Sequence, residues 1–136
     1  LDNLSLSKES GSICTDYVSE SYRKSEKERM AKVLNYLSEN YSDSKISLAR
    51  VAEIANMTPN AFCRFFKKKT QNTLSDYLNR IRIGNACKLL IEGEKQISEI
   101  SYITGFNSLS NFNKQFKLIK KMTPSEYIKK HLEVLG

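Results

Sequence analysis

The sequence contains few of the residues that build metal sites, disulfides and nucleophilic centres. Its three cysteines, Cys14, Cys63 and Cys87, are odd in number, and no pair has the spacing of a zinc site or a redox motif. We therefore expect a reducing, cytosolic environment, with no metal and no cofactor. His131 is the only histidine. A Cys–His nucleophile is formally possible, but a surface histidine near the C-terminus is the favoured interpretation.

Long apolar runs are also absent. No segment approaches the length of a transmembrane helix, and no signal-peptide pattern is present. No stretch alternates apolar and polar residues in the way that predicts a half-buried β-strand. The chain begins with leucine rather than methionine, so we expect it to be a fragment or a processed product of a longer protein.

Acidic residues are outnumbered by basic ones. The chain has 15 Asp and Glu against 22 Lys and Arg, a net charge of +7. Residues 1–24 contain four acidic and three basic side chains, so the remaining 112 residues carry a net charge of +8. This excess favours an anionic partner such as nucleic acid or an acidic membrane. The alternative is that the charge serves solubility alone.

The organisation of the chain changes near residue 26. Residues 1–25 are rich in serine and poor in large apolar residues, so they are predicted to be a linker or a mobile tail, with a short helix at 17–22 as a weak alternative. From residue 26 to 136, apolar spacing predicts an all-α domain of about seven helices with short connections. Capping residues that mark helix starts are Ser47, Thr58, Thr73 and the capping box from Thr123 to Glu126.

The most informative feature is an internal repeat. The segment VAEIANMTPNAFCRFFKKKTQNTLSDYL, which starts at Val51, aligns with ISYITGFNSLSNFNKQFKLIKKMTPSEYI, which starts at Ile100. The second copy has one extra residue in its loop. Each copy reads as a short helix, a tight turn and a second helix, the pattern of a helix-turn-helix motif. The two motifs are predicted at about 47–70 and 97–120.

The second helix of each copy is amphipathic in the same register. Its apolar face carries Phe62 and Phe66 in the first copy and Phe112 and Phe116 in the second, and we assign these to the core. The opposite face carries Asn60, Cys63, Arg64 and Lys67, and fifty residues later Ser110, Asn113, Lys114 and Lys117. Asn and Arg can bind base edges bidentately, and Lys can reach base or phosphate. An ordinary solvated face is the alternative, and the duplicated register favours DNA recognition.

A long helix is predicted between the two motifs, at about 73–92. Such a helix spans roughly 30 Å, and successive major grooves on one face of a duplex lie about 34 Å apart. One chain could therefore place two recognition helices in adjacent major grooves. It would read a non-palindromic site without forming a dimer.

These features together resemble the C-terminal DNA-binding domain of the AraC/XylS family of bacterial transcription regulators. The motifs that carry the resemblance, in the family's order over residues 26–131, are ISLARVAEIANMTPNAFCRFFKKKT, YLNRIRIGNACKLL, ISEISYITGFNSLSNFNKQFK and MTPSEYIKKH. The resemblance implies an all-α domain in which a long central helix joins two helix-turn-helix units. It also implies sequence-specific binding of double-stranded DNA in the bacterial cytoplasm, at the nucleoid, with RNA polymerase as a further partner and no membrane partner.

The resemblance also implies roles for individual residues. Base contacts are expected on the first turns of the third and sixth helices, at Asn60, Cys63, Arg64, Leu109, Ser110, Asn113 and Lys114, with Leu109 placed against a thymine methyl. Phosphate contacts are expected at Thr58, Lys67, Ser108 and Lys117. Scaffold roles are expected for Tyr77, Arg82, Ala86, Leu90, Gly105 and Phe106.

The sequence departs from the family pattern in three places. Gln71 and Lys121 stand where members often have glycine after each recognition helix, so we expect another cap, such as Asn72 in the first unit. Cys63 is small and weakly polar, so base choice there is expected to be loose. Many members carry an N-terminal sensing or dimerisation domain, whereas only the serine-rich stretch precedes the first helix here. We expect a C-terminal domain cut from a longer regulator, with a free-standing short regulator as the alternative.

Two other functions fit part of the sequence. A basic helical adaptor that binds an acidic protein or RNA would not need base-reading residues in a matched register. A DNA-repair alkyltransferase would need an activated thiol, and Cys63 is the only candidate at the expected DNA surface, with no histidine or metal set nearby. Cys87 is expected to be buried in the central helix. We therefore predict that the chain is not an enzyme.

Overall fold

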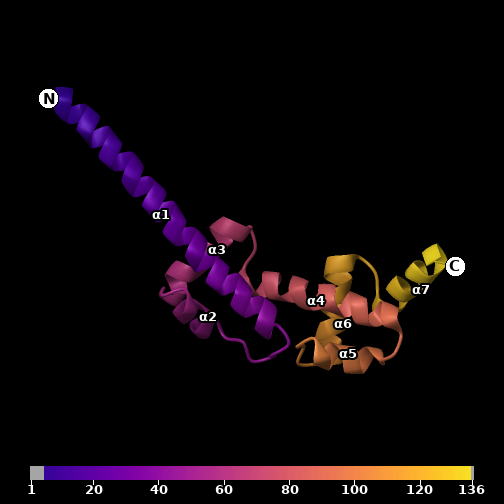
Figure 1. Ribbon diagram of the computed structural model, residues 1–136. Helices are drawn as coiled ribbons and strands as arrows, with labels where there is room; N and C mark the ends of the chain where they lie inside the picture. The colour runs from indigo at the N-terminus through magenta and orange to yellow at the C-terminus, as the bar shows by residue number, and fades with distance from the viewer. Residues whose placement is uncertain (1–4, 136) are drawn as a thin grey trace.

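The chain folds into helices only, over the part that can be described. The computed structural model describes residues 5–135, with side chains for residues 20–134, and within that range there are seven α-helices and no strand (Figure 1). The helices are α1 Ser5–Asn40, α2 Leu48–Ile54, α3 Pro59–Thr70, α4 Leu74–Glu92, α5 Ile97–Ile103, α6 Leu109–Lys120 and α7 Pro124–Leu135. The predicted all-α fold with a long central helix, α4, is confirmed.

The helix starts follow the predicted caps. The side-chain oxygens of Ser47, Thr58 and Thr73 each accept a hydrogen bond from the backbone N–H three residues later, at 3.1, 3.3 and 3.1 Å. Thr123 and Glu126 bond reciprocally, with Thr123 N to Glu126 Oε1 at 2.8 Å and Glu126 N to Thr123 Oγ1 at 3.1 Å. These bonds satisfy N–H groups that have no partner inside the helix. The N–H of Thr123, which donates to the Glu126 carboxylate, is the main cause that lowers the pKa of that carboxyl.

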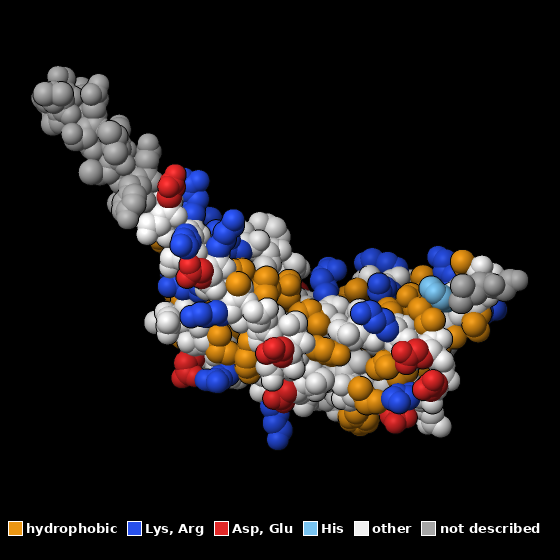
Figure 2. Space-filling model, in the orientation of Figure 1, with side chains coloured by type: hydrophobic (Ala, Val, Ile, Leu, Met, Phe, Trp, Pro, Cys, Tyr) orange, Lys and Arg blue, Asp and Glu red, His pale blue; other side chains and the backbone are white. Residues whose placement is uncertain are grey.

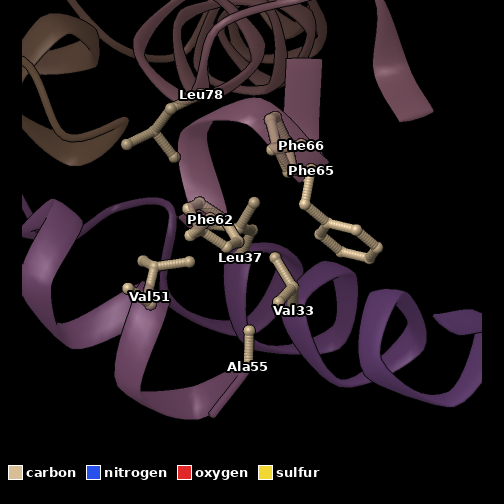
Figure 3. Packing of buried hydrophobic residues seen from close by; sticks show 9 residues of the cluster. Val33, Leu37, Val51, Ala55, Phe62, Phe65, Phe66 and Leu78 are labelled. Atoms are coloured by element: carbon tan, nitrogen blue, oxygen red, sulfur yellow. The ribbon is translucent and has the colours of Figure 1, made fainter. Parts of the chain in front are cut away.

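The first helix-turn-helix unit, α2 and α3, packs with α1 and the start of α4. Its core is centred on Phe62, which is fully buried among side chains from four helices (Figure 3). Phe62 and Phe66 lie on one face of α3 with ring centroids 5.4 Å apart, as predicted. The buried residues of this core are Val33, Leu37, Val51, Ala52, Ala55, Phe62, Phe65, Phe66 and Leu78.

The second unit, α5 and α6, packs with α7 and the C-terminal half of α4. The buried residues of its core are Ile83, Ala86, Cys87, Leu90, Ile100, Phe106, Phe112 and Phe116. The packing repeats that of the first unit. Tyr77 meets Phe66 edge-on at 5.3 Å, and Tyr127 meets Phe116 edge-on at 5.6 Å. The internal repeat in the sequence is therefore a repeat in tertiary structure.

The first helix is longer than the sequence pattern predicts. The pattern predicts a helix only from residue 26, whereas α1 begins at Ser5 and continues to Asn40. The described part of the predicted linker, residues 5–25, is therefore helical, and it extends away from the other helices (Figure 1). No proline precedes Pro59, so nothing breaks the hydrogen-bond ladder. A helix without an apolar stripe gives no periodic signal in the sequence. The domain boundary near residue 26 stays a prediction.

The ends of the two recognition helices, α3 and α6, correct the prediction of another cap. Gln71 and Lys121 themselves adopt the left-handed conformation that glycine usually provides. Asn72 follows the turn and bonds to Thr70. Its backbone N–H donates to Thr70 Oγ1 at 3.1 Å, and its side-chain Nδ2 donates to Thr70 O at 3.0 Å. Each helix therefore ends in the conformation typical of the family pattern, with a residue that is not glycine.

Candidate nucleic-acid interface

The two helix-turn-helix units close their turns with the same hydrogen bond. In the first, Met57 N donates to Ala52 O at 2.9 Å, and in the second Phe106 N donates to Ser101 O at 3.0 Å. A residue with positive φ precedes each donor, Asn56 at 56° and Gly105 at 102°. The shared turn sets how each recognition helix projects from its unit.

The predicted contact residues share the outer face of each recognition helix. In α3 the side chains of Asn60, Cys63, Arg64 and Lys67 are all exposed, opposite the buried phenylalanines. In α6 the exposed residues at matching positions are Ser110, Asn113, Lys114 and Lys117, and the preceding residue, Leu109, is exposed as well. The structure therefore brings all the base-contact candidates of one unit onto one solvent-facing surface.

Thr58 and Ser108 lie at the starts of α3 and α6, as N-caps. Ser108 Oγ accepts from Asn111 N at 3.1 Å, which matches the bond from Ala61 N to Thr58 Oγ1. Each hydroxyl accepts one helix N–H and still has its own hydrogen to donate. A helix start of this kind suits a phosphate oxygen.

A groove runs beside each recognition helix, against the start of the next helix, α4 in the first unit and α7 in the second. The first groove is lined by Cys63, Arg64, Lys67, Thr73 and Leu74. The second is lined by Ile97, Leu109, Asn113, Lys114, Lys117, Thr123, Pro124 and Ser125. Five positions of the first groove match five of the second in the fifty-residue alignment. The two grooves are thus equivalent surfaces.

The sequence pattern predicts Thr73 and Thr123 only as helix caps, whereas both threonines also line these grooves. Their helices α4 and α7 begin beside Lys67 and Lys117, so the positive end of each helix adds to the lysine charge. The fifty-residue spacing that aligns the recognition helices also aligns these two threonines. This spacing is the sequence signal from which the second role of the two threonines could have been predicted.

The lysines at the end of α3 differ in their surroundings. Lys69 Nζ lies 2.8 Å from Glu26 Oε1 on α1, and this contact is the main cause that lowers the pKa of the Glu26 carboxyl. Among the residues with described side chains, Arg64, Lys67 and Lys117 form no ion pair. Their charges are available to an outside anion. Along the upper edge to the right of α1, Figure 2 shows Lys and Arg as the only charged side chains.

The thiols and possible metal ligands offer no catalytic arrangement in the described part of the chain. Cys63 is exposed and Cys87 is buried, as predicted, while the side chain of Cys14 lies outside the described residues. His131 stacks on Tyr127 with ring centroids 5.9 Å apart. Residues 20–134 contain no cluster of His, Cys, Asp and Glu suited to a metal ion, and no described helix is long and apolar enough to cross a membrane.

Comparison with known proteins decides the family. A family profile described as a helix-turn-helix domain matches residues 51–130. The chain belongs to the AraC-type helix-turn-helix family. It is a DNA-binding domain of the type found in transcription regulators. The matched segment contains both recognition helices and all of α4.

One curated relative of this AraC-type domain is YdeC of Bacillus subtilis, named an uncharacterized HTH-type transcriptional regulator. The two are 35% identical over 101 residues, which is 74% of this chain. The match covers 34% of YdeC, so the chain spans about a third of that relative's length.

Solved structures share the fold. The C-terminal domain of AraT, a response regulator from Geobacillus stearothermophilus, superposes with a TM-score of 0.71 at 26% identity, over 75% of this chain and 84% of that one. The DNA-binding domain of AdpA, solved in complex with a target DNA, superposes with a TM-score of 0.69 at 22% identity. That match covers 74% of this chain and 90% of the AdpA chain. The base and phosphate assignments in this chain stay predictions.

Proposed function

We propose that this AraC-type domain recognises a specific double-stranded DNA sequence by inserting α3 and α6 into adjacent major grooves of one duplex. The observation that carries the proposal is a duplicated surface: each outer helix face exposes side chains that can bond to base edges, and each borders an equivalent groove. A single polar helix face has an ordinary explanation as a solvated surface. Two such faces with matching residues in matching grooves favour a repetitive partner such as duplex DNA.

The proposed base contacts come from the exposed first turns of the two helices. They are Asn60, Cys63, Arg64, Leu109, Ser110, Asn113 and Lys114. Arg64 supports the proposal most directly, because its guanidinium is exposed and forms no ion pair among the described side chains. A free guanidinium can bind the O6 and N7 atoms of guanine bidentately.

The proposed phosphate contacts lie beside these base contacts. They are Thr58, Lys67, Ser108 and Lys117. The cap hydroxyls at the starts of α3 and α6, and the lysines in their last turns, are suited to phosphate oxygens. Such contacts carry affinity rather than sequence preference.

The length of α4 supports the two-groove arrangement. Its 19 residues correspond to roughly 28 Å at the usual helical rise. Adjacent major grooves on one face of a duplex lie about 34 Å apart, and the recognition helices lie outward from the α4 axis. One chain can therefore engage two grooves.

The cellular location and the protein partners of the domain are part of the same proposal. We place the domain in the bacterial cytoplasm, at the nucleoid, as part of a transcription regulator that also contacts RNA polymerase. The greater length of YdeC supports an N-terminal sensor or dimerisation domain elsewhere in the whole protein. The predicted linker at residues 1–25, helical from Ser5, would connect the two.

Selection of bound duplexes from a random pool tests the proposal. We expect an enriched motif with two half-sites about ten base pairs apart. Fluorescence anisotropy on the selected duplex should show affinity that falls steeply with salt, because lysine–phosphate contacts release counterions. A scrambled duplex of the same length is the control. Salt-dependent binding without any enriched motif would reduce the domain to a basic helical surface and overturn the base-contact assignments.

A further inference from the structure

Arg82 lies on α4 at the point where the two cores meet. The residue before it, Ile81, packs against the first core, and the residue after it, Ile83, belongs to the second. Although it is charged, the Arg82 side chain is only 9% exposed. A buried guanidinium needs hydrogen-bond acceptors to offset its lost hydration, so its partners show what holds this boundary together.

The hydrogen-bond partners of Arg82 lie on the side of the first unit, in the loop that leads from α1 into α2. Its Nε donates to Tyr41 O at 2.7 Å and its Nη2 donates to Asp43 O at 2.8 Å. Both carbonyls lie in the segment between α1 and α2. Hydrogen bonds from a charged donor are stronger than neutral ones. Arg82 therefore fastens α4 to the loop of the first unit about forty residues away in sequence.

The same side chain also contacts the second unit. The guanidinium carbon of Arg82 lies 5.8 Å from the centre of the Phe106 ring. Phe106 is buried in the second core and follows the turn of the second helix-turn-helix motif. A cation over an aromatic face at this distance is an attractive contact. One side chain thus touches both units.

Gly105, in the turn of the second unit, lies close to both Tyr41 and Arg82. A Cβ atom at this position would lie 2.5 Å from Tyr41 O and 2.8 Å from Arg82 Nε. The backbone of the second turn is therefore pressed against the carbonyl that Arg82 binds. The aligned residue of the first motif is Asn56, which is exposed.

We propose that Arg82 is a positioning residue: together with Tyr41, Asp43, Gly105 and Phe106, it forms a junction that holds the two helix-turn-helix units at one angle and so sets the half-site spacing that the domain accepts. This inference rests on the proposed function. Helix packing lies mainly within each unit and against α4, so a contact between the units has a direct effect on their angle. None of the proposed base and phosphate contacts belongs to the junction, although Arg82 and Cys63 line one hollow, so the test must separate spacing from direct contact.

A spacing series tests the effect on DNA. Binding is measured to the selected duplex, to versions with one base pair added or removed between half-sites, and to a duplex with one half-site. For Arg82→Met we expect unchanged binding to the single half-site. In the wild type, a second unit held at a fixed angle has a high effective concentration at its half-site. Arg82→Met loses this advantage, so we expect it to bind about tenfold more weakly than the wild type at the best spacing and to bind all spacings with similar affinity.

Arg80→Met is the matched control for charge. Arg80 is exposed on α4, two residues before Arg82, and forms no ion pair among the described side chains. It should keep the wild-type spacing preference. If both variants lose the same binding affinity at every spacing, the effect comes from net charge. If Arg82→Met keeps the wild-type spacing preference, Arg82 does not hold the two units at a fixed angle.

A distance measurement on the free protein separates this inference from the proposed function. Spin labels are placed at the aligned, exposed positions Lys68 and Leu118, in a chain with Cys14 and Cys63 replaced by serine. We expect a narrow distance distribution that broadens in Arg82→Met and not in Arg80→Met. An unchanged distribution overturns the junction whatever the DNA result. If Arg82→Met does not fold by circular dichroism, Arg82→Lys and Gly105→Ala take its place in both tests.

Discussion

Gln71 and Lys121 end the two recognition helices in the same left-handed conformation, with φ of 63° and 65°. Each N–H donates to the carbonyl four residues earlier, Gln71 to Lys67 O at 2.8 Å and Lys121 to Lys117 O at 2.9 Å. This conformation costs a residue with a side chain about 1–2 kcal/mol. The repeat therefore contains the same backbone strain twice.

Glycine at either position should stabilise the fold. We expect Gln71→Gly and Lys121→Gly each to raise the free energy of unfolding by about 0.5–1 kcal/mol, since relief of strain is partly offset by the freedom of glycine in the unfolded chain. The gain should be smaller at residue 71, because Gln71 Nε2 donates to Lys68 O at 3.1 Å. Urea denaturation measures both.

Alanine variants control for loss of the side chains. Gln71→Ala and Lys121→Ala remove the side-chain atoms beyond Cβ but keep Cβ, and with it the strain, so neither should gain stability. If the glycine variants were no more stable than the alanine variants, the positive φ values would carry no cost here.

Arg64→Ala tests direct base recognition. Loss of a bidentate contact should weaken binding to the best site by about 1–3 kcal/mol and relax the preference at one base pair. Repeating the duplex selection with the variant measures both effects. Arg80→Ala is the control, since Arg80 is exposed on α4 outside the recognition helices. An Arg64→Ala variant with unchanged affinity and motif would take Arg64 off the list of base contacts.

Lys67→Ala tests the distinction between phosphate and base. We expect it to weaken binding to specific and scrambled duplexes by similar factors and to reduce the slope of log K against log salt by about 1. Lys117→Ala should behave alike, because it occupies the matching place in the second groove. Lys88→Ala, an exposed lysine on α4, should leave the slope nearly unchanged. A loss confined to the specific duplex would make Lys67 a base contact.

The fold was predictable where buried residues recur at a regular spacing in the sequence. Phe62 and Phe66 recur fifty residues later because both units bury the same helix face against α4, and this recurrence is visible in the sequence. The cap residues were predictable because Ser and Thr side chains bond to a backbone N–H only three residues away. Both signals are local, or repeat at a fixed interval.

Other features leave no such trace. The hydrogen bonds from Arg82 end on backbone carbonyls about forty residues away. Every residue has a backbone carbonyl, so no sequence pattern identifies the ones that accept these bonds. The conformation of Gln71 and Lys121 is set by the direction in which the chain must turn toward the next helix, which overrides the preference for glycine. Residues 20–25 of α1 are all exposed, so this part of the helix leaves no apolar period in the sequence.

Cys63 offers a chemical test of where α3 lies on the duplex. Its thiol is exposed on the outer face of α3, whereas Cys87 is buried in α4. Alkylation by N-ethylmaleimide in a Cys14→Ser chain, followed by mass spectrometry, reports both thiols in one sample. At a duplex concentration ten times Kd only about a tenth of the protein is free, so alkylation of Cys63 should slow about tenfold.

Cys87 is the internal control, because its reaction depends on opening of the second core and should be slow with or without specific DNA. A scrambled duplex at the same concentration should protect Cys63 less, in proportion to its weaker binding. The reverse experiment gives the same information, since a chain alkylated at Cys63 beforehand carries extra volume on the groove-facing side of α3 and should lose affinity for the selected duplex. Alkylation of Cys63 at the free rate in saturating specific DNA would mean that α3 lies outside the groove.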